Sequence, residues 1–147
     1  MNARSVDLGK TGESAAHWFL SSIGAKNIHK LATNKIMVKK KMIHTKGTPC
    51  DFICSIPLQV TSGTTWLPSF IEVKLHDEDK LYHSRLSDDQ VNALLKWHEC
   101  NHWSFVLWVH KQECLMFKYP TILFKNGTSI DLTTAKKISW KNSSFKC

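Results

Sequence analysis

Long apolar segments are missing from this sequence. It has no apolar run of about 18 residues, the length that a membrane-spanning helix requires. The N-terminal stretch MNARSVDLGKTGES lacks the apolar centre of a secretory signal peptide. The five cysteines form an odd set without a C-x-x-C spacing, which argues against a disulfide framework. We therefore expect a cytoplasmic protein with reduced thiols.

Acidic residues are missing from two segments. The chain has 20 Lys and Arg against 12 Asp and Glu, a formal net charge of +8. Residues 14–50 contain no acid but seven lysines: Lys26, Lys30, Lys35, Lys39, Lys40, Lys41 and Lys46. No acid follows Asp131. This segregation favours a polyanionic partner, most plausibly nucleic acid, although a basic surface that only aids solubility is the alternative.

The composition is that of one folded domain. With 42% hydrophobic and 22% charged residues, 147 residues can bury a single core. We expect one domain over residues 1–147, with a core over about 9–120 and a basic, partly ordered tail at 121–147. The patterns predict an α/β fold, a mixed β-sheet flanked by helices in the order α-β-β-β-α-β-β. The predicted elements are a helix at Gly12–Gly24, strands at Asn34–His44, Cys50–Ile56 and Ser69–Leu75, a helix from Ser87 to about Asn101, and strands at Trp103–His110 and Cys114–Tyr119.

One strand carries a charged pair. Because side chains alternate along a strand, Glu72 and Lys74 share one face, and Ile71, Val73 and Leu75 fill the other. Asp51 opens the partner strand of the expected hairpin and can lie beside Glu72. Two such carboxylates suit Mg²⁺, and a nearby lysine can assist a water that attacks a phosphodiester. The alternative is a solvated Glu-Lys ion pair without catalytic function.

Three neighbours strengthen the catalytic interpretation. Glu13 stands at the start of a predicted helix in an otherwise basic segment. Gln90 can either contact the site or close a capping box with Ser87. Lys46 and Thr48 offer a cation and a hydroxyl for phosphate contact.

The ordered set of these segments resembles the PD-(D/E)xK nuclease superfamily. The segments are Gly12-Glu13, residues 28–36 (IHKLATNKI), residues 46–52 (KGTPCDF), residues 70–74 (FIEVK) and a helix around Gln90. The RecU-type Holliday junction resolvases are the most similar group, and the archaeal Hjc-type resolvases follow. Two details differ from the family pattern: Cys50 separates Pro49 from Asp51, and Asp89-Gln90 stands where RecU has His-Gln.

The resemblance implies a restriction-endonuclease-like fold and a magnesium-dependent endodeoxyribonuclease of DNA recombination and repair. Glu13, Asp51, Glu72 and the Val73 carbonyl would bind Mg²⁺, for which Mn²⁺ can substitute. Lys74 would be the catalytic lysine, with Gln90 as an accessory residue. The expected partners are four-way DNA junctions and a second copy of the chain, in a bacterial or phage-infected cell. The DNA-binding residues would be Lys30, Lys35, Lys39, Lys40, Lys41, Lys46, Thr48 and Arg85.

Other interpretations stay open at this stage. Another nuclease of the superfamily, of restriction or flap type, and a non-catalytic DNA-binding protein both fit the sequence. The segment 75–86 is either an acidic solvated loop or a DNA contact through Lys80, Tyr82, His83 and Arg85. A zinc site can be imagined at His98, Cys100 and His102 or at Cys50 and Cys54, but no paired C-x-x-C arrangement exists. Cys50 and Cys54 share one strand face, where we expect small buried hydrophobes.

Overall fold

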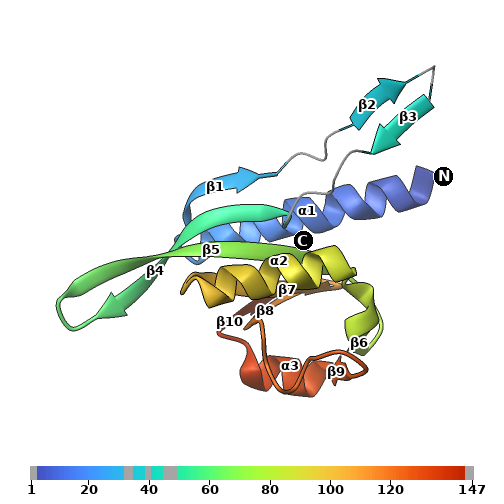
Figure 1. The fold of residues 1–147 in the computed structure, drawn as a ribbon. Helices are drawn as coiled ribbons and strands as arrows, with labels where there is room; N and C mark the ends of the chain where they lie inside the picture. The colour runs from blue at the N-terminus through green and yellow to red at the C-terminus, as the bar shows by residue number, and fades with distance from the viewer. Residues whose placement is uncertain (1–2, 32–34, 39–40, 45–49, 145–147) are drawn as a thin grey trace.

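A six-stranded mixed sheet forms the centre of the molecule, in the order β1-β4-β5-β7-β8-β10 (Figure 1). The computed structural model describes the backbone of residues 3–31, 35–38, 41–44 and 50–144 and the side chains of residues 12–31 and 50–140. In this sheet β5 and β7 run parallel, and all other neighbours are antiparallel. The strands are β1 (Lys26–Lys30), β4 (Phe52–Val60), β5 (Gly63–Leu75), β7 (Trp103–His110), β8 (Glu113–Lys118) and β10 (Lys141–Ser144). The predicted mixed sheet is confirmed.

Helices cover both faces of this sheet. Helix α1 (Ala3–Ser22) packs on one face, and α2 (Asp88–Glu99) and α3 (Leu132–Ile138) pack on the other (Figure 1). Strand β7 serves both cores, because Phe105 and Leu107 belong to the α1 cluster while Val106 and Trp108 belong to the α2 and α3 cluster. This alternation explains why WSFVLWV reads as a continuous apolar run.

Helix α1 approaches the carboxyl end of β5 closely. The predicted helix is confirmed, its residues Phe19 and Leu20 are fully buried, and the chain leaves it at Gly24 with a φ of +84°. The helix begins at Ala3, earlier than the predicted Gly12. A Cβ on Gly12 would lie 3.1 Å from Leu75 Cβ, so glycine permits this contact. The approach places the following residue, Glu13, near the end of the strand.

Two local predictions are confirmed by the backbone. Strands β4 and β5 form the expected hairpin, with Val60 paired to Gly63. Ser87 caps α2, and the capping box with Gln90 is complete. In the described residues, no helix is long and apolar enough to cross a membrane.

Several elements differ from the sequence prediction. The segment Asn34–His44 is not one strand, because β2 (Lys35–Val38) pairs antiparallel with β3 (Lys41–His44). The two short apolar runs on either side of the lysines form separate strands. The predicted loop 75–86 contains β6 (Lys80–Tyr82) and the 3₁₀ helix η1 (His83–Arg85).

The packed structure also continues past residue 120. The tail contains β9 (Ser129–Asp131), α3 and β10, and Phe124, Ile130 and Ala135 are buried in the α2 and α3 cluster. Strand β10 extends the sheet at β8, and β9 pairs with β6. The described tail is therefore part of the core of the domain, which the weak apolar pattern did not reveal.

Candidate functional site

Two carboxyl groups meet where β4 begins and β5 ends. Asp51 lies directly before β4, and its N–H donates to the Ile71 carbonyl at 3.0 Å. Its Oδ2 accepts a hydrogen bond of 2.7 Å from the Val73 N–H. Glu72 lies between those residues on β5, and the two carboxyl groups share a hydrogen bond. The predicted juxtaposition of Asp51 and Glu72 is therefore present.

Lys74 and Gln90 complete a partly buried polar network with Glu72. The Lys74 Nζ lies 3.2 Å from Glu72 Oε1 and donates to Gln90 Oε1 at 3.1 Å. The Gln90 Nε2 donates to the same Glu72 Oε1 at 2.6 Å. Each of the three side chains contacts the other two, which fixes the lysine next to the carboxyl pair.

Gln90 serves the helix and the site at the same time. Its Oε1 accepts from the Ser87 N–H at 2.9 Å, while the Gln90 N–H donates to Ser87 Oγ at 3.2 Å. Its amide nitrogen remains available for Glu72. The capping box is thus confirmed, and the same side chain also contacts Glu72 and Lys74.

Burial and like charge make this carboxyl pair unusual. The Glu72 side chain is only 2% exposed. Burial, followed by the neighbouring Asp51 charge, raises the pKa of Glu72 to about 8, although Lys74 opposes the shift. Burial also raises the pKa of Asp51, against the effects of the Val73 N–H and Lys74. At neutral pH the pair therefore retains a proton in the absence of another cation.

Glu13 lines a pocket whose walls include Phe52 but neither Asp51 nor Glu72. Its carboxylate forms an ion pair with the Lys30 ammonium. The pocket has a volume of about 400 Å³ and is lined by Glu13, Ser14, His17, Lys30 and Phe52. Ser14 and His17 were not among the predicted site residues, although His17 follows Glu13 at the i+4 spacing that places two side chains together on a helix.

The donor set at the strand ends fits a hard divalent cation. Mg²⁺ commonly takes one or two carboxylates and completes its shell with water and phosphate oxygens. Asp51 and Glu72 supply two, and a cation would remove the repulsion that holds a proton on the pair. Among the side chains that the structure describes, no three His, Cys, Asp or Glu are gathered as a metal cluster. Glu13 and the Val73 carbonyl therefore remain predicted rather than assembled ligands.

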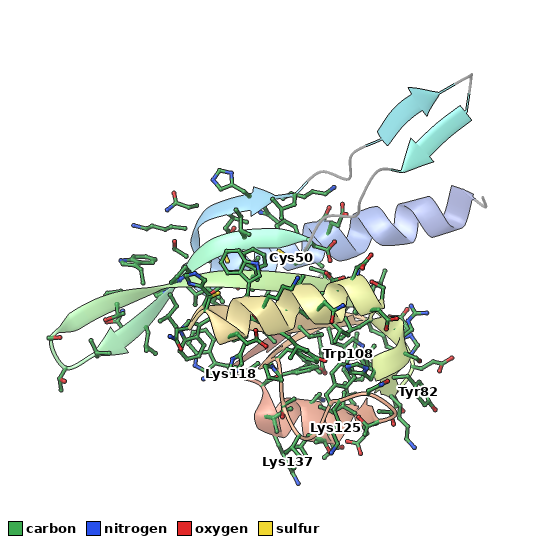
Figure 2. The ribbon with its side chains drawn as sticks, in the orientation of Figure 1. Cys50, Tyr82, Trp108, Lys118, Lys125 and Lys137 are labelled. Atoms are coloured by element: carbon green, nitrogen blue, oxygen red, sulfur yellow. The ribbon has the colours of Figure 1, made fainter. Side chains whose placement is uncertain are left out.

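The predicted DNA-binding residues have mixed outcomes. The Lys30 side chain is 54% exposed at the edge of the sheet, and Arg85 is exposed on η1. For Lys35 and Lys41 only the strand backbone is described, and Lys39, Lys40, Lys46 and Thr48 lie outside the described residues. Cys50, labelled in Figure 2, marks where the chain re-enters the described part beside Asp51.

One member of the segment 75–86 cannot contact DNA directly. His83 is 4% exposed, and its Nε2 lies 2.8 Å from the Tyr119 hydroxyl. Its ring also contacts Phe124, so its role is packing. Lys80, Tyr82 and Arg85 are exposed and stay available, which leaves the DNA-contact interpretation open for these three.

The cysteines have a structural role, as the sequence favours. Cys50 and Cys54 are buried, and desolvation raises the pKa of each thiol to about 12. Such thiols are poor metal ligands and poor nucleophiles. His98, Cys100 and His102 do not form a metal cluster in the described residues.

Comparison of the sequence with family models and with curated proteins finds no match. Among solved structures, the fold is similar to that of Hjc, a Holliday junction resolvase of the hyperthermophilic archaeon Archaeoglobus fulgidus. The TM-score is 0.56 at 19% sequence identity, and the match covers 87% of this chain and 92% of the other. The resemblance inferred from the sequence is thus confirmed at the level of architecture: this chain has the restriction-endonuclease-like fold of an archaeal Hjc resolvase.

Proposed function

We propose that this protein is a metal-dependent endonuclease that hydrolyses DNA phosphodiesters at branched DNA and resolves four-way junctions. The observation that carries the proposal is the network of Asp51, Lys74 and Gln90 around the buried Glu72 at the strand ends. A solvated ion pair would not need this network, since exposed pairs stabilise proteins little and hold no fixed geometry. The net charge of +8 and the shared fold with Hjc support a DNA substrate.

In the proposed reaction, water attacks the scissile phosphorus in line. The cleaved DNA strand then carries a 5′-phosphate and a 3′-hydroxyl end. Mg²⁺ or Mn²⁺ bound by Asp51 and Glu72 would supply Lewis-acid activation and charge neutralisation. The Lys74 ammonium, 15% exposed beside Glu72, would orient the water and offset the negative charge that develops on the phosphate. Gln90 holds Lys74 and Glu72 in register, and the Val73 N–H fixes Asp51.

Recognition would depend on shape and charge. Exposed lysines are the natural contacts for phosphates, and they carry no sequence information. Cleavage of a two-fold symmetric junction requires two active sites, so we propose a homodimer acting in the cytoplasm. The cleavage of one DNA strand by one active site would not depend on the dimer surface.

The test uses three labelled substrates: a mobile four-way junction, a flap and a linear duplex. Each is incubated with the protein in Mg²⁺ and in EDTA. We expect paired, metal-dependent cuts in the junction. Preferred cleavage of the flap or duplex would indicate another nuclease of this fold. Junction binding without cleavage at saturating Mg²⁺ would indicate a non-catalytic DNA-binding protein.

A further inference from the structure

The ion pair between Glu13 and Lys30 joins a predicted metal ligand to a predicted DNA contact. Lys30 pairs with Phe52 in the register of β1 and β4, and the adjacent Leu31 N–H donates to the Asp51 carbonyl at 2.9 Å. Lys30 is therefore only one strand away from the carboxyl pair. Glu13 reaches it from α1, with its own side chain 35% exposed. Both side chains line the 400 Å³ pocket, whose other walls are Ser14, His17 and Phe52.

We propose that Lys30 is a positioning residue that holds Glu13 out of the metal site until a DNA backbone phosphate binds Lys30, after which Glu13 joins Asp51 and Glu72 at the divalent cation. This inference rests on the proposed function and adds to it a mechanism by which the substrate assembles its own metal site. It assigns the pocket between α1 and β1 to a phosphate of the DNA strand.

The charges in the DNA-free protein favour this arrangement. Asp51 and Glu72 are buried together and share a hydrogen bond. A third carboxylate beside them would add repulsion, whereas an ion pair with Lys30 neutralises it. Glu13 is nevertheless close to the pair. The preceding Gly12 packs against Leu75 at the end of β5, and Lys30 pairs with Phe52, the residue after Asp51.

The pocket has the chemistry that a phosphodiester requires. Lys30 is more than half exposed, so a phosphate can reach its ammonium without rearrangement of the strand. Ser14 and His17 line the same pocket and can donate hydrogen bonds, and Phe52 closes it, with the His17 ring packed edge-on at 6.5 Å between centroids. A phosphate that binds Lys30 would therefore compete directly with the Glu13 carboxylate for the Lys30 ammonium group.

The first experiment measures Mn²⁺ affinity by calorimetry in a double-mutant cycle without DNA. Lys30→Gln should raise the affinity by up to about fivefold, the equivalent of the ~1 kcal/mol upper value for an exposed pair. In a Glu13→Gln background the same substitution should give no gain, because there is no carboxylate to release. Lys30→Arg should keep the wild-type affinity, since it preserves the ion pair. Lys26→Gln removes the same charge from the other end of β1, where Lys26 lies over the Trp66 ring, and serves as the matched control.

An equal gain in Mn²⁺ affinity from Lys30→Gln in both backgrounds would mean that the loss of one positive charge alone explains the gain. That result would overturn the proposal. If the wild-type protein binds no Mn²⁺ at millimolar concentration, both the proposed metal site and this proposal are wrong.

The second experiment adds a four-way junction in a Lys74→Ala background, chosen to keep the DNA intact. The junction should raise Mn²⁺ affinity, and Lys30→Gln should abolish most of this rise.

Failure of this inference can be distinguished from failure of the proposed function. A protein that cuts junctions with Mg²⁺ but shows additive effects of Glu13→Gln and Lys30→Gln has the proposed activity without the substrate-controlled ligand. A protein that cuts no DNA lacks the proposed activity, whatever the metal cycle shows. A rise in Mn²⁺ affinity on junction binding that persists undiminished in Lys30→Gln also overturns the inference.

Discussion

Glu72→Gln should make the metal-free protein more stable at neutral and alkaline pH while it removes the proposed activity. The amide keeps the shape of the carboxyl group. Its oxygen can accept from Lys74 and Gln90, as Glu72 Oε1 does, and its nitrogen can donate to Asp51. The variant therefore reproduces the protonated form of Glu72 at every pH, without the buried charge.

The magnitude follows from the raised pKa. In the unfolded chain Glu72 titrates near 4.5, and in the folded protein near 8. Between these values the folded state keeps a proton that the unfolded state releases, so stability falls as pH rises through this window. The slope is about 1.4 kcal/mol per pH unit, so the wild type loses roughly 3 kcal/mol from pH 4.5 to pH 7, and the variant does not.

The assay is urea unfolding in EDTA at several pH values between 5 and 9, for wild type and variant side by side. The difference in free energy of unfolding between them should widen with pH and level off above about 8. Glu78→Gln is the matched control, because the Glu78 side chain is 79% exposed and its removal should leave the pH profile unchanged. Parallel profiles for wild type and Glu72→Gln would refute the reasoning that burial and Asp51 raise this pKa.

Three further predictions concern catalysis, binding and the helix cap. Lys74→Ala should lower single-turnover junction cleavage by at least about 10²-fold with little change in affinity, and Lys74→Arg should not restore it; wild-type rates in either variant would contradict the proposed role. Junction affinity should fall steeply with salt, by about 0.9 in log K per phosphate neutralised, and Lys30→Gln should reduce that slope by about one; a salt-independent affinity would exclude phosphate-dominated binding. Ser87→Ala should cost about 1 kcal/mol in chemical denaturation but leave cleavage intact, whereas Gln90→Ala should reduce both; equal cleavage rates in the two variants would limit Gln90 to capping.

Local patterns predicted the parts of the site that depend on short-range geometry. The alternation of β5 placed Glu72 and Lys74 on one face, and the serine and glutamine three residues apart predicted the capping box. The hairpin turn then set the register that brings Asp51 to Glu72. Each of these features depends on residues close in sequence or on one turn, and such features are the ones that periodicity can reveal.

Long-range pairings and short elements were not predictable in the same way. Strand β10 pairs with β8 although α3 lies between them in the sequence. No periodic signal in its residues, KNSS, indicates a strand. Helix α3 spans Leu132–Ile138, which is too short for a clear apolar stripe, although Asp131 caps it through a 2.7 Å hydrogen bond to the Thr134 N–H. That aspartate was the available signal for a helix start. The Glu13 ion pair with Lys30 depends on how α1 crosses β1, which no local pattern encodes.

The same features that suit the site to a cation make it a weak point of the metal-free fold. Two carboxyl groups lie together at the strand ends, and their contact is favourable only while the pair holds a proton. A ligand that binds the folded state alone adds to stability in proportion to the logarithm of its concentration over its dissociation constant. Mg²⁺ should therefore stabilise the wild type most at the pH where the pair is most repulsive. Because Glu72→Gln removes both the repulsion and a proposed ligand, the cation should stabilise that variant less, and this difference separates a metal site from a merely structural network.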